Sequence, residues 1–293
     1  MKKLIVFCGI MVFMLPVVGM TAGMEHAVDT SGADVLITRT YANNGLLIET
    51  HNMQDDTYTT YENGKALQTT LEGDVIASYH YENGVLKTVT DQYQNTTFYE
   101  NGMKTSKENH NNETVAVYTY DAAGRLTTVT DPRITDGTGV TKYNYDGKIL
   151  LSMEGFDQNG LATITHFESG RQTYTQTQLE GGDWVTTAVY EYDGVKLSKV
   201  YTFAATEGGY TGTSADTSSA SYTGYTTYDS HGRPDRSYDM EGNLASVTIY
   251  EGAFIKQQVS FPGGAEGAYI NVTDYNEFGE AGTTYQVSNP GGW

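Results

Sequence analysis

A short motif recurs along most of this chain: an aromatic residue, usually tyrosine, is followed two to four positions later by glycine, with acidic or amide residues between them. Many copies are separated by about ten or about twenty residues, the lengths of one strand with its turn and of a whole hairpin. The copies begin at Tyr41, Tyr61, Tyr81, Tyr99, Tyr120, Tyr145, Phe156, Phe167, Tyr192, Tyr228, Tyr238, Tyr250 and Tyr275. The motif therefore predicts a succession of antiparallel β-hairpins.

The residues between the aromatic residue and the glycine determine which turn we expect. Asp-Gly predicts a two-residue type I′ turn, because aspartate and glycine tolerate the positive φ that both central positions require. Glu-Asn-Gly predicts a three-residue loop with glycine in the left-handed position of a bulge. The turn aspartates, in the short turns as well as in the longer loops, are expected to accept backbone hydrogen bonds with their side chains. The predicted turn-forming residues are Gly64, Gly84, Gly102, Asp121, Gly124, Asp146, Gly147, Asp193, Gly194, Asp239 and Gly242.

Several tyrosines occur in pairs two positions apart, so each pair lies on one face of its strand. Repeated aromatic rings can stack on sugars or on another chain. They can also pair across strands, where each pair stabilises a sheet by about 0.2–1 kcal/mol. Cross-strand pairing is favoured because the tyrosines recur at nearly every turn, but both interpretations remain open. The candidate ligand-stacking residues are Tyr79, Tyr81, Tyr118, Tyr120, Tyr143, Tyr145, Tyr190 and Tyr192.

No helical period of 3.6 residues is evident beyond the first residues of the chain, and the segments after the turns are rich in β-forming residues. The sequence therefore predicts an all-β protein of antiparallel hairpin repeats in an open, twisted or spiralling sheet. We expect one repeat domain over residues 41–279, a lead-in at 24–40 and a tail at 280–293. Residues 204–227, rich in glycine and serine, predict a low-complexity loop or an extra hairpin.

The first residues have the layout of a secretory signal peptide. Met1-Lys2-Lys3 precedes an apolar run that ends in small residues near Gly23. Residues 1–23 are therefore expected to be a cleaved signal, and an uncleaved anchor is the alternative. Cleavage predicts a secreted, periplasmic or cell-surface protein without a membrane span. It also removes Cys8, the only cysteine, and with it any disulfide or thiolate ligand.

Charge and motifs exclude several function classes. The chain has 36 acidic and 17 basic residues, a balance that disfavours binding to nucleic acid or anionic lipid. It lacks the Gly-x-Ser-x-Gly, phosphate-loop and His-Glu-x-x-His motifs. Its six histidines are scattered, so we expect no metal centre and no cofactor. Calcium bridging between the aspartate-bearing turns is an open alternative, although such short loops offer few oxygen ligands.

The segment from Tyr118 to Pro132 resembles a full YD repeat of the Rhs family, and Tyr228–Arg233 and Tyr238–Leu244 resemble partial copies. That resemblance implies a secreted or surface protein with a long, spiralling antiparallel sheet. Weaker similarity links the chain to MORN-type repeats and to cell-wall-binding tyrosine/glycine repeats. The Rhs signature Asp-Pro-x-Gly is not reproduced at Asp131-Pro132-Arg133, which has no glycine after Arg133, so no catalytic residue carries over.

These observations predict a non-catalytic, exported repeat protein that serves surface interaction or adhesion, with carbohydrate or another cell-envelope component as its partner. Self-association into a matrix or filament through the edges of an open sheet is the alternative. A third possibility, a polysaccharide-active enzyme, requires two carboxylates about 5–10 Å apart in a cleft.

Overall fold

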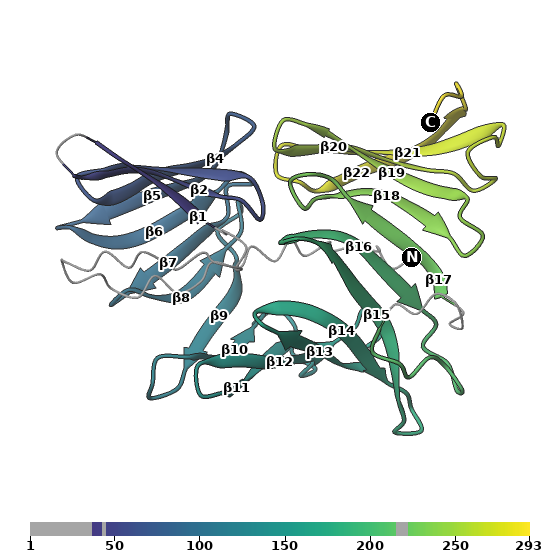
Figure 1. Cartoon of the computed structure of the whole chain (residues 1–293), viewed down its shortest axis with the longest axis horizontal. Helices are drawn as coiled ribbons and strands as arrows, with labels where there is room; N and C mark the ends of the chain where they lie inside the picture. Colours follow the sequence, from purple (N-terminus) through teal and green to yellow (C-terminus); the bar gives the residue numbers. More distant parts are fainter. Residues whose placement is uncertain (1–36, 43–44, 215–221) are drawn as a thin grey trace.

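The computed structural model describes residues 37–42, 45–214 and 222–293 (Figure 1). The predicted signal peptide and most of the predicted lead-in lie outside the described residues. Every regular element in the described ranges is a β-strand, so the all-β expectation is confirmed. No helix in these ranges is long and apolar enough to cross a membrane.

The strands are β1 (Ile37–Tyr41), β2 (Leu47–Asn52), β3 (Thr57–Glu62), β4 (Lys65–Leu71), β5 (Asp74–Glu82), β6 (Val85–Asp91), β7 (Thr96–Glu100), β8 (Met103–Glu108), β9 (Thr114–Tyr120), β10 (Leu126–Thr130), β11 (Val140–Asp146), β12 (Ile149–Phe156), β13 (Ala162–Glu168), β14 (Arg171–Gln178), β15 (Trp184–Asp193), β16 (Lys196–Phe203), β17 (Tyr222–Tyr228), β18 (Pro234–Asp239), β19 (Leu244–Glu251), β20 (Phe254–Ser260), β21 (Tyr269–Tyr275) and β22 (Ala281–Ser288). β22 lies within the predicted tail, and all of β17 except its last residue lies within the stretch predicted as a loop or extra hairpin.

Each strand pairs antiparallel with the strand that follows it in sequence, from β1 to β22. The result is one 22-stranded sheet that stays open, because β1 and β22 do not pair with each other. The sheet curls so that the end that contains β1 to β5 comes to lie beside the end that contains β18 to β22, at the top of Figure 1. Turns after even-numbered strands lie on one long edge, and turns after odd-numbered strands lie on the other.

The Glu-Asn-Gly turns contain two residues, not the three predicted. Glu62 is paired with Lys65, so only Asn63 and Gly64 lie in the turn, with φ of 51° and 75°. Asn83-Gly84 and Asn101-Gly102 repeat this pattern. Positive φ at both central positions is the requirement of a type I′ turn. Asparagine tolerates the left-handed region, so the glutamate remains in its strand.

The Asp-Gly turns also differ from the prediction of type I′. Asp146 is paired with Ile149 and Asp193 with Lys196, so each aspartate is the last residue of its strand. Gly147 and Gly194 take the first central position, with φ of 55° and 58°, and the following residue does not have positive φ. Glycine alone at the first position is typical of a type II′ turn. In the described contacts neither aspartate accepts the expected backbone hydrogen bond, because its backbone is still extended.

The four-residue loops are organised by their first aspartate. Asp121 Oδ1 accepts the backbone N–H groups of Ala123 and Arg125, both at 2.9 Å, and the Gly124 N–H donates to the Asp121 carbonyl. Asp239 and Gly242 occupy the same positions in the loop between β18 and β19. One carboxylate thus satisfies two backbone donors that the turn leaves without a ladder partner.

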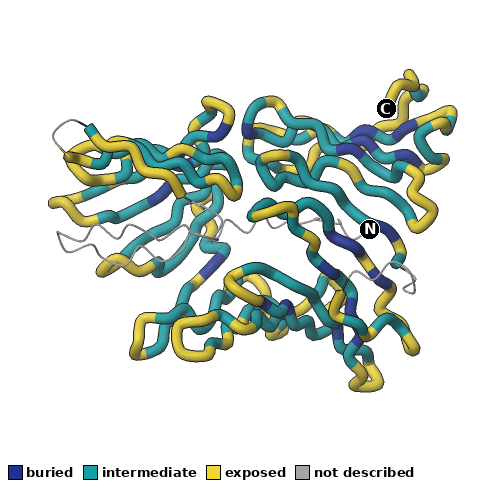
Figure 2. The backbone as a smooth tube through the Cα atoms, in the orientation of Figure 1, coloured by how far each residue is buried: buried dark blue, intermediate teal, exposed yellow. Residues whose placement is uncertain are grey.

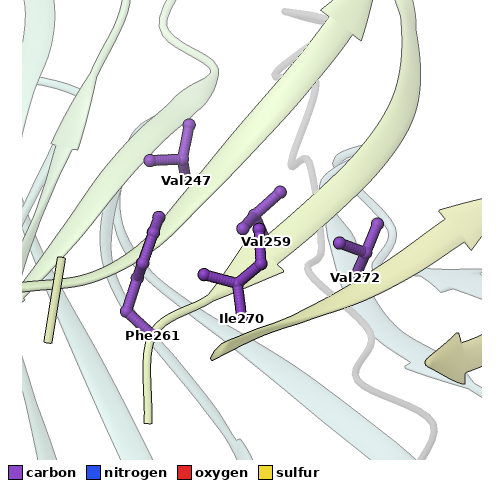
Figure 3. Packing of buried hydrophobic residues seen from close by; sticks show 5 residues of the cluster. All are labelled: Val247, Val259, Phe261, Ile270 and Val272. Atoms are coloured by element: carbon purple, nitrogen blue, oxygen red, sulfur yellow. The ribbon is translucent and has the colours of Figure 1, made fainter. Parts of the chain in front are cut away.

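Two faces of the sheet differ in composition. We call the face that carries Tyr79 and Tyr190 the tyrosine face, and the other the opposite face. Figure 2 shows that buried residues are most frequent from β15 onward. In this part of the opposite face, Val189, Tyr201 and Phe203 form one cluster of buried residues. Figure 3 shows the second hydrophobic cluster, which contains Val247, Val259, Phe261, Ile270 and Val272.

Candidate functional site

All eight tyrosines predicted as ligand-stacking residues lie on the tyrosine face, on strands β5, β9, β11 and β15, and all are half-buried. The Tyr79 hydroxyl shares a hydrogen bond of 3.1 Å with Thr69, and the Tyr190 hydroxyl shares one of 3.2 Å with Thr175. Each tyrosine therefore reaches a threonine on the preceding strand. The structure uses these hydroxyl groups within the sheet.

The environment of the tyrosines is apolar enough to disfavour their ionised form. Burial, together with the smaller effect of the neighbouring Tyr118, raises the pKa of Tyr143 to about 12. Burial also raises the pKa of Tyr192 to about 12. Because Tyr118 and Tyr143 lie on β9 and β11, this coupling links tyrosines of successive hairpins. The structure thus places all the predicted residues on one face and brings Tyr118 close to Tyr143.

A feature that the sequence reasoning missed is the basic residue directly after the turn glycine. Arg171, which follows Gly170, places its guanidinium 5.5 Å from the ring centre of Tyr192 and donates to the Gly194 carbonyl at 2.8 Å. One arginine therefore covers the last tyrosine of the next hairpin and also binds the turn of that hairpin. We call this arrangement the arginine clasp. Gly-Arg directly after a turn was the available sequence signal.

The clasp recurs along the chain. Arg125 lies 5.4 Å from the Tyr145 ring and donates to the Gly147 carbonyl. Arg233 lies 4.3 Å from the Tyr250 ring and donates to the Gly252 carbonyl at 2.7 Å. Cation–π contacts of this kind are worth about 0.5–2 kcal/mol. The repeat therefore ties each hairpin to the next through side chains as well as through strand pairing.

A hollow with a volume of about 740 Å³ lies beside one of these clasps. Tyr190, Tyr192 and Arg171 line it, together with the carboxylate residues Glu168 and Glu191. Thr213 and Ser214, from the connection after β16, close one side. Aromatic rings beside several hydrogen-bonding groups are the chemistry of a shallow polar-ligand site.

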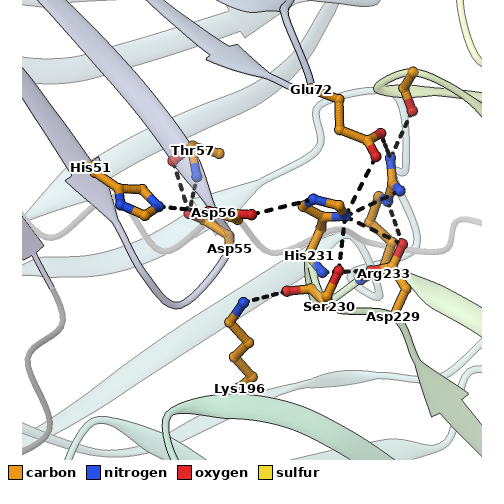
Figure 4. A network of polar contacts seen from close by, with 11 residues as sticks. His51, Asp55, Asp56, Thr57, Glu72, Lys196, Asp229, Ser230, His231 and Arg233 are labelled. Atoms are coloured by element: carbon orange, nitrogen blue, oxygen red, sulfur yellow. Dashed lines mark hydrogen bonds and ion pairs between the residues drawn. The ribbon is translucent and has the colours of Figure 1, made fainter.

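A second group of polar residues joins turns that are far apart in sequence, where the two ends of the curled sheet meet (Figure 4). His231, in the loop between β17 and β18, lies 3.4 Å from Asp56 in the loop between β2 and β3. Arg233 pairs with Asp229 at 2.7 Å within its own loop and with Glu72 of the β4–β5 turn at 3.0 Å. We call this line of contacts the seam. Nothing in the sequence indicated which turns would meet.

The seam continues beyond the network of Figure 4. Asp74 Oδ2 accepts the Ala253 N–H at 2.9 Å. Gln92 donates to the Ala253 carbonyl at 3.1 Å, and His110 stacks on Phe278 with ring centres 4.1 Å apart. On one side of the seam, Asp74, Gln92 and His110 lie in or next to turns that follow even-numbered strands. On the other side, Ala253 and Phe278 belong to turns that follow odd-numbered strands. The two long edges of the sheet therefore contact each other, and on one edge the contact involves the turns after β2, β4, β6 and β8.

Charges in the seam are balanced by close contacts. A hydrogen bond from His51 at 2.6 Å lowers the pKa of Asp56, whereas burial raises the pKa of the adjacent Asp55. Within the described ranges, no three histidine or carboxylate residues are arranged to hold a metal ion. The arrangement serves ionic docking of one turn on another.

Comparisons with known proteins bear on the repeat. The RHS Repeat model matches residues 101–133, which include the Tyr118–Pro132 segment, so the resemblance to this repeat is confirmed there. No curated protein matches the chain.

Solved structures similar to this chain are much longer. TcdB2-TccC3 without its hypervariable C-terminal region is 12% identical, with 86% of this chain and 15% of that chain covered and a TM-score of 0.27. TcdB2-TccC3 itself is 14% identical over 86% and 15%, with a TM-score of 0.26. The Photorhabdus luminescens Tc holotoxin pore is 11% identical over 86% and 17%, with a TM-score of 0.21. This chain thus spans 15–17% of the length of these chains.

Proposed function

We propose that this chain is an exported, non-catalytic YD-repeat protein that binds carbohydrate of the cell envelope in the hollow beside Tyr190 and Tyr192. The observation that carries the proposal is the composition of that hollow: two tyrosines, one arginine and two glutamates line it. Sugar rings stack on aromatic faces, and their hydroxyl groups bind charged and amide side chains. The hollow is shallow, which suits a chain segment of a polymer better than an enclosed small molecule.

Binding is tested with isolated envelope polysaccharides and a glycan array, using the wild type, Tyr192→Ala and Tyr145→Ala. Tyr145 is a matched control, because Arg125 covers it in the same way but it lies outside the hollow. We expect Tyr192→Ala to weaken binding at least about tenfold, equivalent to about 1.4 kcal/mol, and Tyr145→Ala to leave it unchanged. Absence of binding by the wild type, or equal loss in both variants, contradicts the proposed site.

The proposal that the protein is non-catalytic has its own test. Glu168 and Glu191 are the carboxylate residues that line the hollow. Incubation of the protein with a polysaccharide that it binds should release no new reducing ends. Release that disappears in Glu168→Gln or Glu191→Gln would instead identify a glycoside hydrolase with a carboxylate pair.

Export rests on the sequence of residues 1–23 alone. Expression of the full chain in a bacterial host, followed by fractionation and intact-mass measurement, should yield a mature protein that begins near residue 24 and lies outside the cytoplasm. Retention of residues 1–23 in a membrane fraction would identify an anchor instead.

A further inference from the structure

The last strand of the sheet, β22, is an unprotected edge. It pairs with β21 on one side, and no strand in the described part of the chain lies on its other side. All eight of its residues, Ala-Gly-Thr-Thr-Tyr-Gln-Val-Ser, are exposed. None is charged and none is proline, although charges and proline are the usual means by which natural edge strands avoid pairing. The backbone donors and acceptors of β22 that point away from β21 therefore have no strand partner in the described part of the chain.

A row of apolar side chains on the opposite face ends at this edge. Val247, Val259, Val272 and Tyr285 are successive cross-strand partners on β19 to β22. The first three are 9%, 1% and 6% exposed, whereas Tyr285 is 42% exposed. Val287 and its cross-strand partner Ile270 repeat the pattern, because Val287 is 38% exposed and Ile270 is 2% exposed. The apolar row that starts in the second hydrophobic cluster thus continues onto β22, where its side chains are exposed.

We propose that this strand is a second copy of β22, paired antiparallel across a twofold axis so that the sheet continues from one molecule into the other. Antiparallel pairing preserves the pattern of every other strand pair in the molecule. A register centred on Tyr285 places it opposite the partner's Tyr285 and places Thr283 opposite the partner's Val287. Aromatic and β-branched pairs of this kind stabilise adjacent strands.

The composition of the two edge strands favours pairing of β22 with a second β22 over pairing of β22 with β1 of another molecule. β1 has five residues and carries Arg39, whereas β22 has eight uncharged residues that are complementary to themselves. A twofold contact uses the same surface on both molecules, so assembly stops at a dimer. The net charge of −19 on each chain opposes close approach, and added salt therefore strengthens the dimer by screening that repulsion.

Sedimentation velocity over a concentration series tests the dimer with the full-length wild type, Val287→Lys and Val117→Lys. Val117 is a matched control: it is a valine on the opposite face with 37% exposure, but it lies on β9 inside the sheet. We expect a dimer that dissociates on dilution, with a Kd raised at least about tenfold by Val287→Lys and unchanged by Val117→Lys. A wild type that is monomeric at every concentration, or equal effects of both lysines, overturns the proposal.

Oxidative cross-linking tests the register and does not depend on the lysine variant. In a Cys8→Ser background, Tyr285→Cys should form a disulfide-linked dimer, because the two residues are opposite each other across the axis. Thr284→Cys should not, because it would face the partner's Gln286. Species that grow beyond the dimer would show that β22 pairs with β1 of the next molecule, which also overturns the twofold arrangement. The hollow beside Tyr192 takes no part in this contact, so glycan binding and dimer formation succeed or fail independently.

Discussion

The first half of the sheet, β1 to β12, and the second half, β13 to β22, share one hairpin motif but bury different surfaces. In the first half the buried residues lie on the tyrosine face: Thr69, Leu71, Ala77, Val89 and Ala116. The opposite face of that half carries Ser78, His80 and Val117, all exposed. In the second half the opposite face buries two hydrophobic clusters as well.

Segments outside the hairpin motif account for this difference. Tyr210, in the connection after β16, stacks on Phe203 with ring centres 4.5 Å apart. Trp293, near the end of the chain, lies edge-on to Phe261 at 5.3 Å, and its indole N–H donates to Asn289. Apart from the connection between β10 and β11, the turns of the first half are two to five residues long and are too short to form such a cover. A repeat therefore supplies strands, whereas irregular insertions determine which face becomes a core.

Among variants that compare the two halves, Phe261→Ala is expected to change the free energy of unfolding most. Phe261 is buried in the second cluster, so its removal should lower the free energy of unfolding by about 3–5 kcal/mol. Phe156→Ala is the control, because Phe156 on β12 is exposed and should lose less than about 1 kcal/mol. Urea unfolding followed by circular dichroism measures both. Similar losses in the two variants would show that the halves are equally dependent on buried aromatic side chains.

The next effect comes from the seam that joins the halves. Arg125 and Arg233 each form a clasp and an ion pair with the aspartate four residues before, but only Arg233 also binds Glu72 of the other half. The Arg233 side chain is 11% exposed and that of Arg125 is 36% exposed. We expect Arg233→Ala to cost about 2–3 kcal/mol and Arg125→Ala about 1 kcal/mol.

A double-mutant cycle isolates the contact across the seam. Glu72→Gln combined with Arg233→Ala should cost less than the sum of the two single changes, since both remove the same ion pair. Glu72→Gln combined with Arg125→Ala should be additive. Additive behaviour in both cycles would show that the seam holds the two halves together without this pair.

Alkaline pH should weaken both halves alike, because the tyrosine face is continuous. Tyr143 and Tyr192 have pKa values raised by burial to about 12, above the value of about 10 expected in the unfolded chain. Their contribution to stability is full below pH 10 and is lost as the pH rises towards 12. Ultraviolet difference absorbance should show these tyrosines ionising after the exposed ones. A single transition near pH 10 for all tyrosines would contradict the burial of this face.

The smallest difference is expected between two turn aspartates. Asp157 Oδ1 accepts the backbone N–H groups of Asn159 and Leu161, at 2.8 and 2.9 Å. Asp146 is the last residue of β11, before a two-residue turn. Asp157→Ala should lower the free energy of unfolding by about 1 kcal/mol, and Asp146→Ala should change it by less than about 0.5 kcal/mol. Thermal unfolding of both variants checks the ranking, and a reversed order would refute this account of the turns.

The aromatic–glycine motif was sufficient to predict strands, reversals and the open sheet, because each reversal depends on local backbone preferences. It failed on the turn types, because the sequence does not reveal whether Glu62 or Asp146 remains paired as the last residue of its strand. Asp56 and His231 could not be brought together from sequence, since their contact depends on the curvature summed over the strands between them. The arginine clasp was readable in principle, as Gly-Arg recurs at Arg125, Arg171 and Arg233.

Turns that meet across the seam lie 161 to 179 positions apart in the chain. The hairpins between them lengthen the curl that brings these turns together. Gain or loss of a hairpin there would lengthen or shorten the curl, and the same docking chemistry would then join a shifted partner. Duplication of a stretch of about twenty residues is thus a simple route to sheets that curl over different lengths.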